Sequence, residues 1–514
     1  MAITEIPHAE APETEQAHKH VVVIGGGFGG IASALRCRAL GLQVTLVERL
    51  PHLGGRAQVF ERDGFKHDAG PTVITAPFLF EELFQLFDED LHDHLTFAPL
   101  TPWYRYYFHD GRSFDYSGDE AHMSAEIARF SPPDVAGYKA LVEASRKIFE
   151  VGFTKLAHRP FTRFTDMMKQ VPALLRLRAD RTVSALVRKH IKHPLLRRAF
   201  SIQPLLVGGN PFTTTSIYSL IHFLERKWGV FFCMGGTGAL VQALQDLMHR
   251  QGITTITGGD VEKLVMDGEK VAAVQLANGQ LLTADYVICN ADPPTVYREL
   301  LAGGGRAAER PKRLVPEHMT KYSMGLYVLF FGTQRKYDDV AHHTIWLGRR
   351  FKELLADIFD RGHMPDDFSL YLHRPTATDA SFAPDGCDSF YVLCPVPNLQ
   401  TDLDWSVVGP DLRNRIVAAL SATILPDLET HITAEFWMDP THFRDDYRAR
   451  HGAGFSIAPI FSQSAWFRYR NRDPHIDNLY FTGAGTHPGA GLPGVVSSAK
   501  VVETLLRERL PTTR

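Results

Sequence analysis

A short apolar run, a tight glycine turn and an apolar helix follow one another near the start of the chain, in VVVIGGGFGGIASAL, residues 21–35. Gly25, Gly27 and Gly30 fit the pattern G-x-G-x-x-G, and Glu48 ends the next β-branched run, at the distance typical of an acid that binds a ribose. Such glycines let the backbone approach a pyrophosphate, which the helix N-terminus attracts. The stretch therefore predicts a Rossmann-type dinucleotide-binding unit and, with it, an α/β fold.

A second glycine motif, LGGR, follows this acid within a few residues. Gly55 and Arg56 are placed where a backbone N–H group and a guanidinium can both reach a pyrophosphate. Together with Glu48 they complete the pattern E-x(4)-L-G-G-R, which resembles the flavin-containing amine oxidase superfamily. That resemblance implies FAD, not NAD, as the dinucleotide.

A third glycine-rich turn lies more than four hundred residues later, in GAGTHPGAGLPGVVSSAK, residues 483–500. It follows the strand-like NLYF and runs into a helix, so the N–H groups near Gly494 and Val495 lie at a helix N-terminus, which carries about half a positive charge. FAD is long, and its two ends need separate holders. We expect the first turn to bind the pyrophosphate and this last turn to face the flavin ring and stabilise its anionic reduced form.

The 514 residues are enough for two or three domains. A net charge of -3 gives no reason to expect nucleic acid as a partner, and five scattered cysteines without a C-x-x-C pair argue against a disulfide framework or a zinc site. Residues 1–19 are polar and lack the features of a signal or transit peptide, so we expect a disordered tail. The longest apolar run, SMGLYVLFFG, is only strand-length, which favours a soluble or peripheral protein without a transmembrane helix.

The chain alternates between two kinds of segment. Strand–turn–helix patterns occur in residues 20–75, 225–301 and 470–510, whereas aromatic strands and amphipathic helices fill residues 76–224 and 302–469. We therefore predict one Rossmann-type FAD-binding domain assembled from three segments. The two insertions are expected to form a mixed α+β substrate domain.

Longer stretches carry a closer resemblance. They are DAGPTVIT (68–75), LLVGGNPFTTTSIYSLIHFLERKWGV (205–230), QSAWFRYRNRD (463–473) and NLYFTGAGTHPGAGLPGVVSSAK (478–500). From about residue 20 to its C-terminus the chain is similar to the bacterial phytoene desaturases of the carotenoid desaturase family. The resemblance implies one FAD, no metal, and successive desaturation of 15-cis-phytoene towards neurosporene or lycopene, by hydride transfer from the polyene to flavin. Phytoene and partly desaturated carotenes would be the substrates, and oxygen or a quinone the electron acceptor.

The resemblance also implies a set of residues in contact with FAD. Carried over position by position, they are Gly25, Gly27, Gly30, Glu48, Gly55, Arg56, Gly70, Pro71, Val261, Asp292, Gly483, Gly494 and Val495. Val261 and Asp292 rest on short strand motifs that are also compatible with a plain core position.

The catalytic residues stay unassigned, because a bond flanked by polyene leaves a delocalised cation and does not obviously need a strong general base. Three weak candidates remain. His487 lies inside the last glycine turn, where it either handles a proton or holds the loop by hydrogen bonds. Glu143 and Arg146 lie on a predicted helix, where they either reach the substrate tunnel or form a solvated pair.

Residues 159–200 are strongly basic and rich in Phe, Leu and Met. Basic amphipathic helices of this kind lie in the membrane interface, where anionic lipid attracts them. We expect this segment to hold the protein peripherally on the cytoplasmic side of an anionic membrane, from which a water-insoluble polyene can enter. The alternative is a solvated helical insertion with a basic face.

Other functions share parts of these patterns. A carotenoid isomerase or saturase of the same family would use flavin with a different net redox change, and an amine oxidase would need polar access for an amine. An escort protein that binds prenyl lipids has a related fold without flavin catalysis. The complete G-G-R motif and the last glycine turn argue against this escort role.

Overall fold

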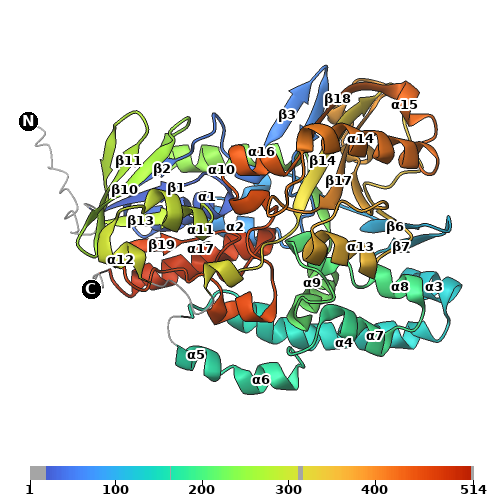
Figure 1. Ribbon diagram of the computed structural model, residues 1–514, viewed down its shortest axis with the longest axis horizontal. Helices are drawn as coiled ribbons and strands as arrows, with labels where there is room; N and C mark the ends of the chain where they lie inside the picture. The colour runs from blue at the N-terminus through green and yellow to red at the C-terminus, as the bar shows by residue number, and fades with distance from the viewer. Residues whose placement is uncertain (1–18, 162–163, 311–315, 511–514) are drawn as a thin grey trace, which may run out of the picture.

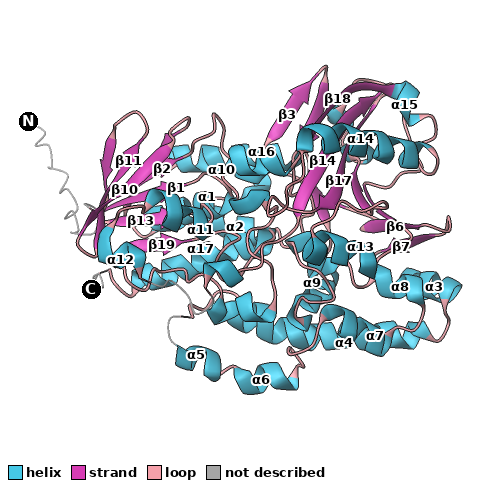
Figure 2. Cartoon of the chain, in the orientation of Figure 1, coloured by secondary structure: helices cyan, strands magenta, loops and turns pink. Residues whose placement is uncertain are grey.

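The computed structural model describes residues 19–161, 164–310 and 316–510, so all but the last residue of the predicted tail lies outside the described residues. Strands gather in two groups, at the upper left and the upper right, and most helices lie below and between them (Figure 2). The chain is therefore of the mixed α/β class, as predicted. Among the described residues, no helix is both long enough and apolar enough to cross a membrane.

Five parallel strands form the first sheet, in the order β19-β13-β1-β2-β9 (Figure 1). Their bounds are His20–Ile24 (β1), Gln43–Val47 (β2), Thr254–Ile256 (β9), Tyr286–Cys289 (β13) and Leu479–Phe481 (β19). The central strand β1 pairs with β2 on one side and with β13 on the other, where Val21 is the register partner of Tyr286. The sheet thus joins distant parts of the chain.

Alternating side chains of β1 explain why both faces of this sheet are covered. Val21 and Val23 pack with a layer of helices, and Val22 and Ile24 pack against a small antiparallel sheet on the opposite face. The helices are α1 (Phe28–Ala39), α2 (Phe78–Gln85), α10 (Gly236–Arg250) and α17 (Leu492–Arg507). The small sheet comprises β10 (Val261–Asp267), β11 (Lys270–Leu276) and β12 (Leu281–Thr283). A strand buried on both faces has a continuous apolar sequence.

Helix α2 packs with this first unit, although it follows the predicted boundary at residue 75. Leu79, Phe80, Leu83 and Phe84 are buried in the core that the helical layer shares with β1. Residues three or four apart on a helix lie on one face, so these four form a single apolar stripe. Leu95 lies in the same core, and the first segment therefore continues to about this residue.

Seven strands form the second sheet, in the order β18-β14-β17-β16-β15-β6-β7. Their bounds are Tyr104–Phe108 (β6), Ser113–Tyr116 (β7), Gly325–Thr333 (β14), His343–Leu347 (β15), Leu370–His373 (β16), Asp388–Val396 (β17) and Ile432–Met438 (β18). Only β15 and β6 run parallel. The longest apolar run of the sequence is β14, nine consecutive buried residues. Helix α14 (Trp405–Ser421) packs on one face of this sheet through Leu412, Ile416 and Leu420.

Helices of the first insertion pack beneath the second sheet (Figure 1). They are α3 (Glu120–Phe130), α4 (Asp134–Val151), α7 (Val183–His190), α8 (Pro194–Ala199) and α9 (Leu220–Trp228). Val183, Val187 and Leu196 belong to their core, so the apolar face of the second half of segment 159–200 packs into the protein interior. Helices α5 (Phe164–Met168) and α6 (Val171–Arg176) lie outermost, at the bottom of the view.

The remaining elements connect these layers. They are β3 (Val59–Arg62), β4 (Phe65–Asp68), β5 (Phe97–Pro99), β8 (Phe231–Cys233), α11 (Pro293–Thr295), α12 (Gly305–Glu309), α13 (Lys352–Ala356), α15 (Leu428–His431) and α16 (Pro440–Asp445). Strands β3 and β4 form an antiparallel hairpin, and β5 pairs with β8.

Candidate functional site

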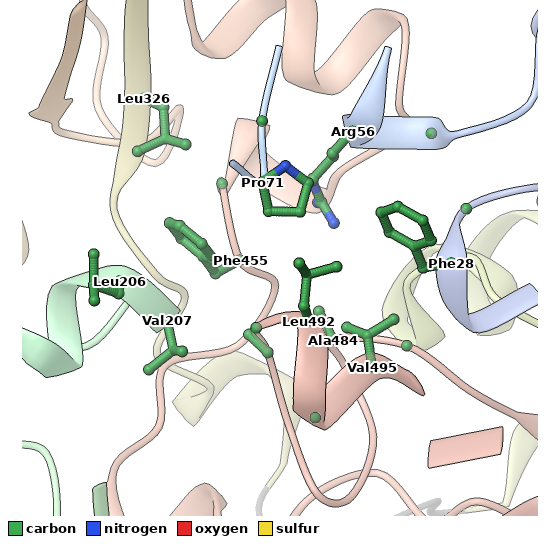
Figure 3. Close-up of a pocket in the computed structure, with 18 of the residues that line it drawn as sticks. Phe28, Arg56, Pro71, Leu206, Val207, Leu326, Phe455, Ala484, Leu492 and Val495 are labelled. Atoms are coloured by element: carbon green, nitrogen blue, oxygen red, sulfur yellow. The ribbon is translucent and has the colours of Figure 1, made fainter. Parts of the chain in front are cut away.

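A cavity of about 560 Å³ lies between the two sheets. Figure 3 shows Arg56 and Phe28 on one side of this space, Leu326 and Phe455 on another, and the start of α17 below them. Of the predicted cofactor residues, all except Gly30 line the cavity. Its wall is glycine-rich and polar at the first sheet and mainly apolar elsewhere.

The first glycine turn packs directly against the start of α1. A Cβ on Gly30 would lie 1.9 Å from the carbonyl oxygen of Gly25, so no side chain fits there. Gly27 is the N-cap of α1 and supplies no side-chain hydrogen bond, and the first turn of the helix holds no acid. The first N–H groups of α1 therefore favour an anion at the cavity wall.

Glu48 follows β2 and holds the first turn in place. Its Oε2 accepts a hydrogen bond from the N–H of Gly26 at 2.6 Å, and its Oε1 accepts one from Leu50 at 2.8 Å. Burial raises the pKa of Glu48, and these two backbone hydrogen bonds oppose the rise. Because Glu48 lines the cavity beside the turn, it lies where a Rossmann fold places its ribose-binding acid.

The G-G-R motif lies against the first turn. A Cβ on Gly55 would be 3.2 Å from the Cα of Gly27. Arg56 extends into the cavity, with Nη2 3.4 Å from the carbonyl oxygen of Ala453 (Figure 3). Its Nε is buried without a hydrogen-bond partner among the described residues. A guanidinium beside uncapped N–H groups suits a diphosphate.

The last glycine turn brings the start of α17 to the same cavity. A Cβ on Gly494 would lie 2.5 Å from the carbonyl oxygen of Gly489, so the loop closes tightly over the helix. The N-cap, Gly491, supplies no side-chain hydrogen bond. The N–H of Val495 donates to the Gly491 carbonyl at 2.9 Å and is not free for a ligand. Val495 faces the cavity through its side chain, and Gly494 keeps its first-turn N–H.

Gly70, Pro71, Val261 and Asp292 also line the cavity. Oδ2 of Asp292 is buried and has no hydrogen-bond partner within the described part of the chain. Burying a polar atom without a partner costs about 1–3 kcal/mol. Together with Nε of Arg56, this oxygen indicates that a polar ligand belongs at the glycine end.

His487 is the one catalytic candidate from the sequence that lines the cavity. Its Nε2 lies 2.8 Å from the carbonyl oxygen of Leu156, and its Nδ1 has no hydrogen-bond partner among the described residues. Burial lowers the pKa of His487 to about 4. A carbonyl can only accept, so Nε2 carries the ring proton and Nδ1 holds the lone pair.

Glu143 and Arg146 lie on the exposed side of α4 and are not part of the cavity wall. Nε of Arg146 donates to Oε2 of Glu143 at 2.7 Å, and the same guanidinium pairs with Glu150. Spacings of three and four residues bring such pairs together on a helix. This arrangement is the solvated ion pair that the sequence allowed as the alternative to a catalytic role.

A buried acid that the sequence analysis did not single out also lines the cavity. Glu225 of α9 accepts the hydroxyl hydrogen of Tyr104 through Oε1 at 2.9 Å, while its Oε2 has no partner among the described residues. Burial raises the pKa of Glu225 to about 7. Ile221 lies one turn earlier on the same helix face and lines the cavity too. A single acidic residue on an otherwise apolar helix face was the sequence feature from which Glu225 could have been predicted as a site residue.

Comparison with known proteins gives one family and several relatives. The model of the flavin-containing amine oxidoreductases matches residues 28–502. A lycopene-forming phytoene desaturase from Pantoea ananas is 46% identical, over 96% of this chain and 100% of that protein. A neurosporene-forming phytoene desaturase from Rhodobacter capsulatus is 39% identical, over 94% and 93%. A solved putrescine oxidase with bound putrescine is 14% identical and shares the fold, with a TM-score of 0.63 over 96% and 99%.

Proposed function

Because this chain belongs to the family of flavin-containing amine oxidoreductases, together with the bacterial phytoene desaturases, we propose that it is itself a phytoene desaturase. FAD is its cofactor. The enzyme removes hydrogen from 15-cis-phytoene in successive steps towards neurosporene or lycopene. The observation that carries this proposal is a cavity whose glycine-lined end suits a dinucleotide and whose remaining wall suits a hydrocarbon.

The glycine end would hold FAD through the first N–H groups of α1, the guanidinium of Arg56 and the carboxylate of Glu48. The N–H of Gly494 at the start of α17 would serve the other end of the cofactor. When bound, FAD supplies the hydride-accepting chemistry that removal of hydrogen from a carbon–carbon bond requires. The single parallel sheet supports one FAD-binding domain built from residues 20–95, 225–301 and 470–510.

The apolar wall binds and orients the substrate. Leu206, Val207, Leu326 and Phe455 converge on one space in Figure 3. Such side chains favour a long hydrocarbon by excluding water, and a shaped lining holds one bond of the chain in the reactive position. Excluding water also protects a carbon centre that has lost hydride from attack by solvent.

Nδ1 of His487 is our proposed proton acceptor. It lies on a residue of the cavity wall, it holds the ring lone pair, and it lacks another partner among the described residues. With a pKa of about 4, the imidazole is neutral at pH 7 and therefore free to accept a proton, although it is a weak base. A weak base is sufficient where loss of hydride has already made the neighbouring C–H acidic.

Helices α5 and α6 are our proposed membrane contact, on the cytoplasmic side. Phe161, Met167 and Gln170, next to or within α5, line the cavity, so its wall reaches this outer edge. Met168 and Phe461 are 49% and 48% exposed there. Arg176 is exposed at the end of α6, and Arg181 is exposed just before α7. Apolar anchors beside exposed cations are typical of an interfacial segment.

Replacing Arg176 and Arg181 with glutamine is expected to weaken binding to anionic vesicles about 30-fold. Each arginine near an anionic surface contributes about 1 kcal/mol of attraction, and the two together about 2 kcal/mol. Co-sedimentation with vesicles that contain phosphatidylserine measures the change. The control is Arg112→Gln with Arg335→Gln, two solvent-accessible arginines in loops that follow β6 and β14 of the second sheet. Equal binding by both double variants would exclude α5 and α6 as the attachment site.

Replacing Arg56 with alanine is expected to weaken FAD binding by about 1.5–3 kcal/mol, because a charge-assisted hydrogen bond to the diphosphate is lost. Titration of the flavin-free protein with FAD, followed by flavin fluorescence, gives the dissociation constant. Arg112→Ala removes an exposed arginine far from the cavity and is expected to leave that constant unchanged. An unchanged constant in Arg56→Ala would remove Arg56 from the site.

Expression in a host that accumulates phytoene tests the proposed function, with the carotenes identified by chromatography and absorption. We expect neurosporene or lycopene, and phytoene unchanged with the empty vector. A saturated or merely isomerised product would indicate a saturase or an isomerase instead. Unchanged phytoene beside a protein that is fully loaded with flavin would reject the proposal.

Oxygen or a membrane quinone is the proposed electron acceptor. Turnover by the purified enzyme is then expected in air, or anaerobically with an added quinone, without any nicotinamide. Strict dependence on added NAD(P)⁺ would contradict this choice while leaving the carotene product unaffected.

A further inference from the structure

Three histidines meet at the ends of two neighbouring inner strands of the second sheet. His343 opens β15 and is the register partner of His373, which ends β16. His342 directly precedes β15, and all three side chains are buried. One ring nitrogen of each lies within 4.8 Å of one ring nitrogen of the other two. The cluster is separate from the residues that line the cavity.

The hydrogen bonds of this cluster leave nitrogens on its inner side without partners. Nδ1 of His342 lies 2.7 Å from Oγ1 of Thr378, and Nδ1 of His343 lies 2.8 Å from the hydroxyl oxygen of Tyr371. Nε2 of both residues, and both ring nitrogens of His373, are buried without a partner among the described residues. Several such atoms at one point are costly unless a ligand satisfies them.

The spacing of the rings suits one metal ion. Their centroids are 4.6, 4.8 and 5.4 Å apart. Three imidazoles bound tetrahedrally to one zinc ion, with Zn–N of about 2.0–2.1 Å, have centroids about 5 Å apart. Burial favours the neutral imidazole, the form that binds metal. When Nδ1 donates to a hydroxyl, Nε2 carries the lone pair, as in metal sites whose ligands are oriented by a second hydrogen bond.

Asp68 supplies a carboxylate beside the cluster. Its Oδ1 accepts from the N–H and the hydroxyl of Thr237, at 3.1 and 3.0 Å. Its Oδ2 has no such partner among the described residues and lies 3.9 Å from Nε2 of His373. A carboxylate there can hold Nε2–H of His373, which leaves Nδ1 for the metal, and its charge offsets that of a cation.

We propose that His342, His343 and His373 bind one divalent transition-metal ion of the zinc class, with Asp68 as the carboxylate that orients His373. Three neutral nitrogen ligands suit zinc better than magnesium or calcium, which prefer oxygen. The ion would tie β15 and β16 to β4, which leads to Gly70 and Pro71 of the cavity wall. His342 and Thr378 also line a second hollow, which gives the ion an access route. This site goes beyond the family resemblance, which implied no metal.

Equilibrium dialysis of the purified flavin-containing protein tests the proposal. The protein is treated with EDTA, dialysed against buffered micromolar ZnCl₂, and analysed for zinc and flavin. We expect one tightly held zinc per chain and a higher melting temperature with zinc. His343→Gln and His373→Gln are expected to weaken zinc binding by at least about 100-fold. The matched control is His222→Gln, a buried histidine that bonds the Phe200 carbonyl and lies outside the cluster.

Three results would overturn the proposal. In the first, the wild-type protein binds no stoichiometric zinc. In the second, the cluster variants bind as much zinc as His222→Gln does. In the third, zinc raises the melting temperature of all variants equally. A variant that fails to fold does not decide the matter, because the wild-type protein can be loaded with Co²⁺. Tetrahedral Co²⁺ bound to nitrogen has visible absorption bands, and their absence at stoichiometric Co²⁺ would reject the site.

Discussion

Replacing Gly30 with alanine is expected to abolish flavin binding. The added Cβ would lie 1.9 Å from the carbonyl oxygen of Gly25, well inside van der Waals contact. The backbone fixes the position of a Cβ, and the atom that it meets is a backbone oxygen, so neither can turn aside. Helix α1 must move away from the turn, and its first N–H groups move with it. The flavin content of the purified protein, from its visible absorption relative to protein, measures the loss.

Ala39→Gly is the control for this experiment. Ala39 is the exposed last residue of α1, and a glycine in a helix costs about 1 kcal/mol without touching the turn. We expect this variant to keep its flavin and its circular dichroism spectrum. If Gly30→Ala also kept a full complement of flavin, the close packing of α1 on the turn would not be what positions the cofactor.

Glu225→Gln is expected to change the free energy of unfolding differently at two pH values. At pH 8 the variant is expected to gain about 3 kcal/mol over the wild type, compared with the difference between the two proteins at pH 4.5. Burial raises the pKa of Glu225 from 4.5 to about 7, so the folded state holds this proton where the unfolded state has lost it. The contribution of this protonated acid to the free energy of unfolding is fully present below pH 4.5 and is lost as the pH rises to about 7. The shift is worth about 3 kcal/mol, and glutamine removes this dependence because it stays neutral.

Denaturant unfolding of wild type and Glu225→Gln across this pH range gives the difference in unfolding free energy. Glu262→Gln, at an exposed position of β10, controls for the amide substitution itself. A difference between Glu225→Gln and wild type that does not change with pH would show that folding does not raise the pKa of Glu225. The cavity would then hold a charged carboxylate beside Tyr104.

Local patterns predicted the parts of the site that are contiguous in the chain. The turn around Gly25–Gly30, the acid at Glu48 and the strand-like run of β14 are each readable from neighbouring residues, because a turn, a strand end and an apolar period are local properties. The same applies to the short strand and glycine turn before α17. Family resemblance then named FAD and the carotene substrate.

Other features arise from contacts that no local pattern contains. The spacing of the basic residues in segment 159–200 did not distinguish α5 and α6 from α7. Helices α5 and α6 lie on the outside of the protein, whereas Val183 and Val187 of α7 pack in the core. His373 joins His342 only because β16 pairs with β15, and Glu225 becomes buried only when Tyr104 of a distant strand covers it. The N–H of Val495 donates to the Gly491 carbonyl, because the register of the first turn of α17 decides which amides are free.

The strand order of the parallel sheet has a consequence for synthesis of the protein. Strand β1 is made well before its partner β13, which follows some 260 residues later, and β19, which pairs with β13, is made later still. Pairings across such separations form slowly, since a long loop must close before any contact is gained. The complete parallel sheet therefore exists only after β19 has been made. Until then the nascent chain must keep β1, with its run of valines, from pairing with other chains.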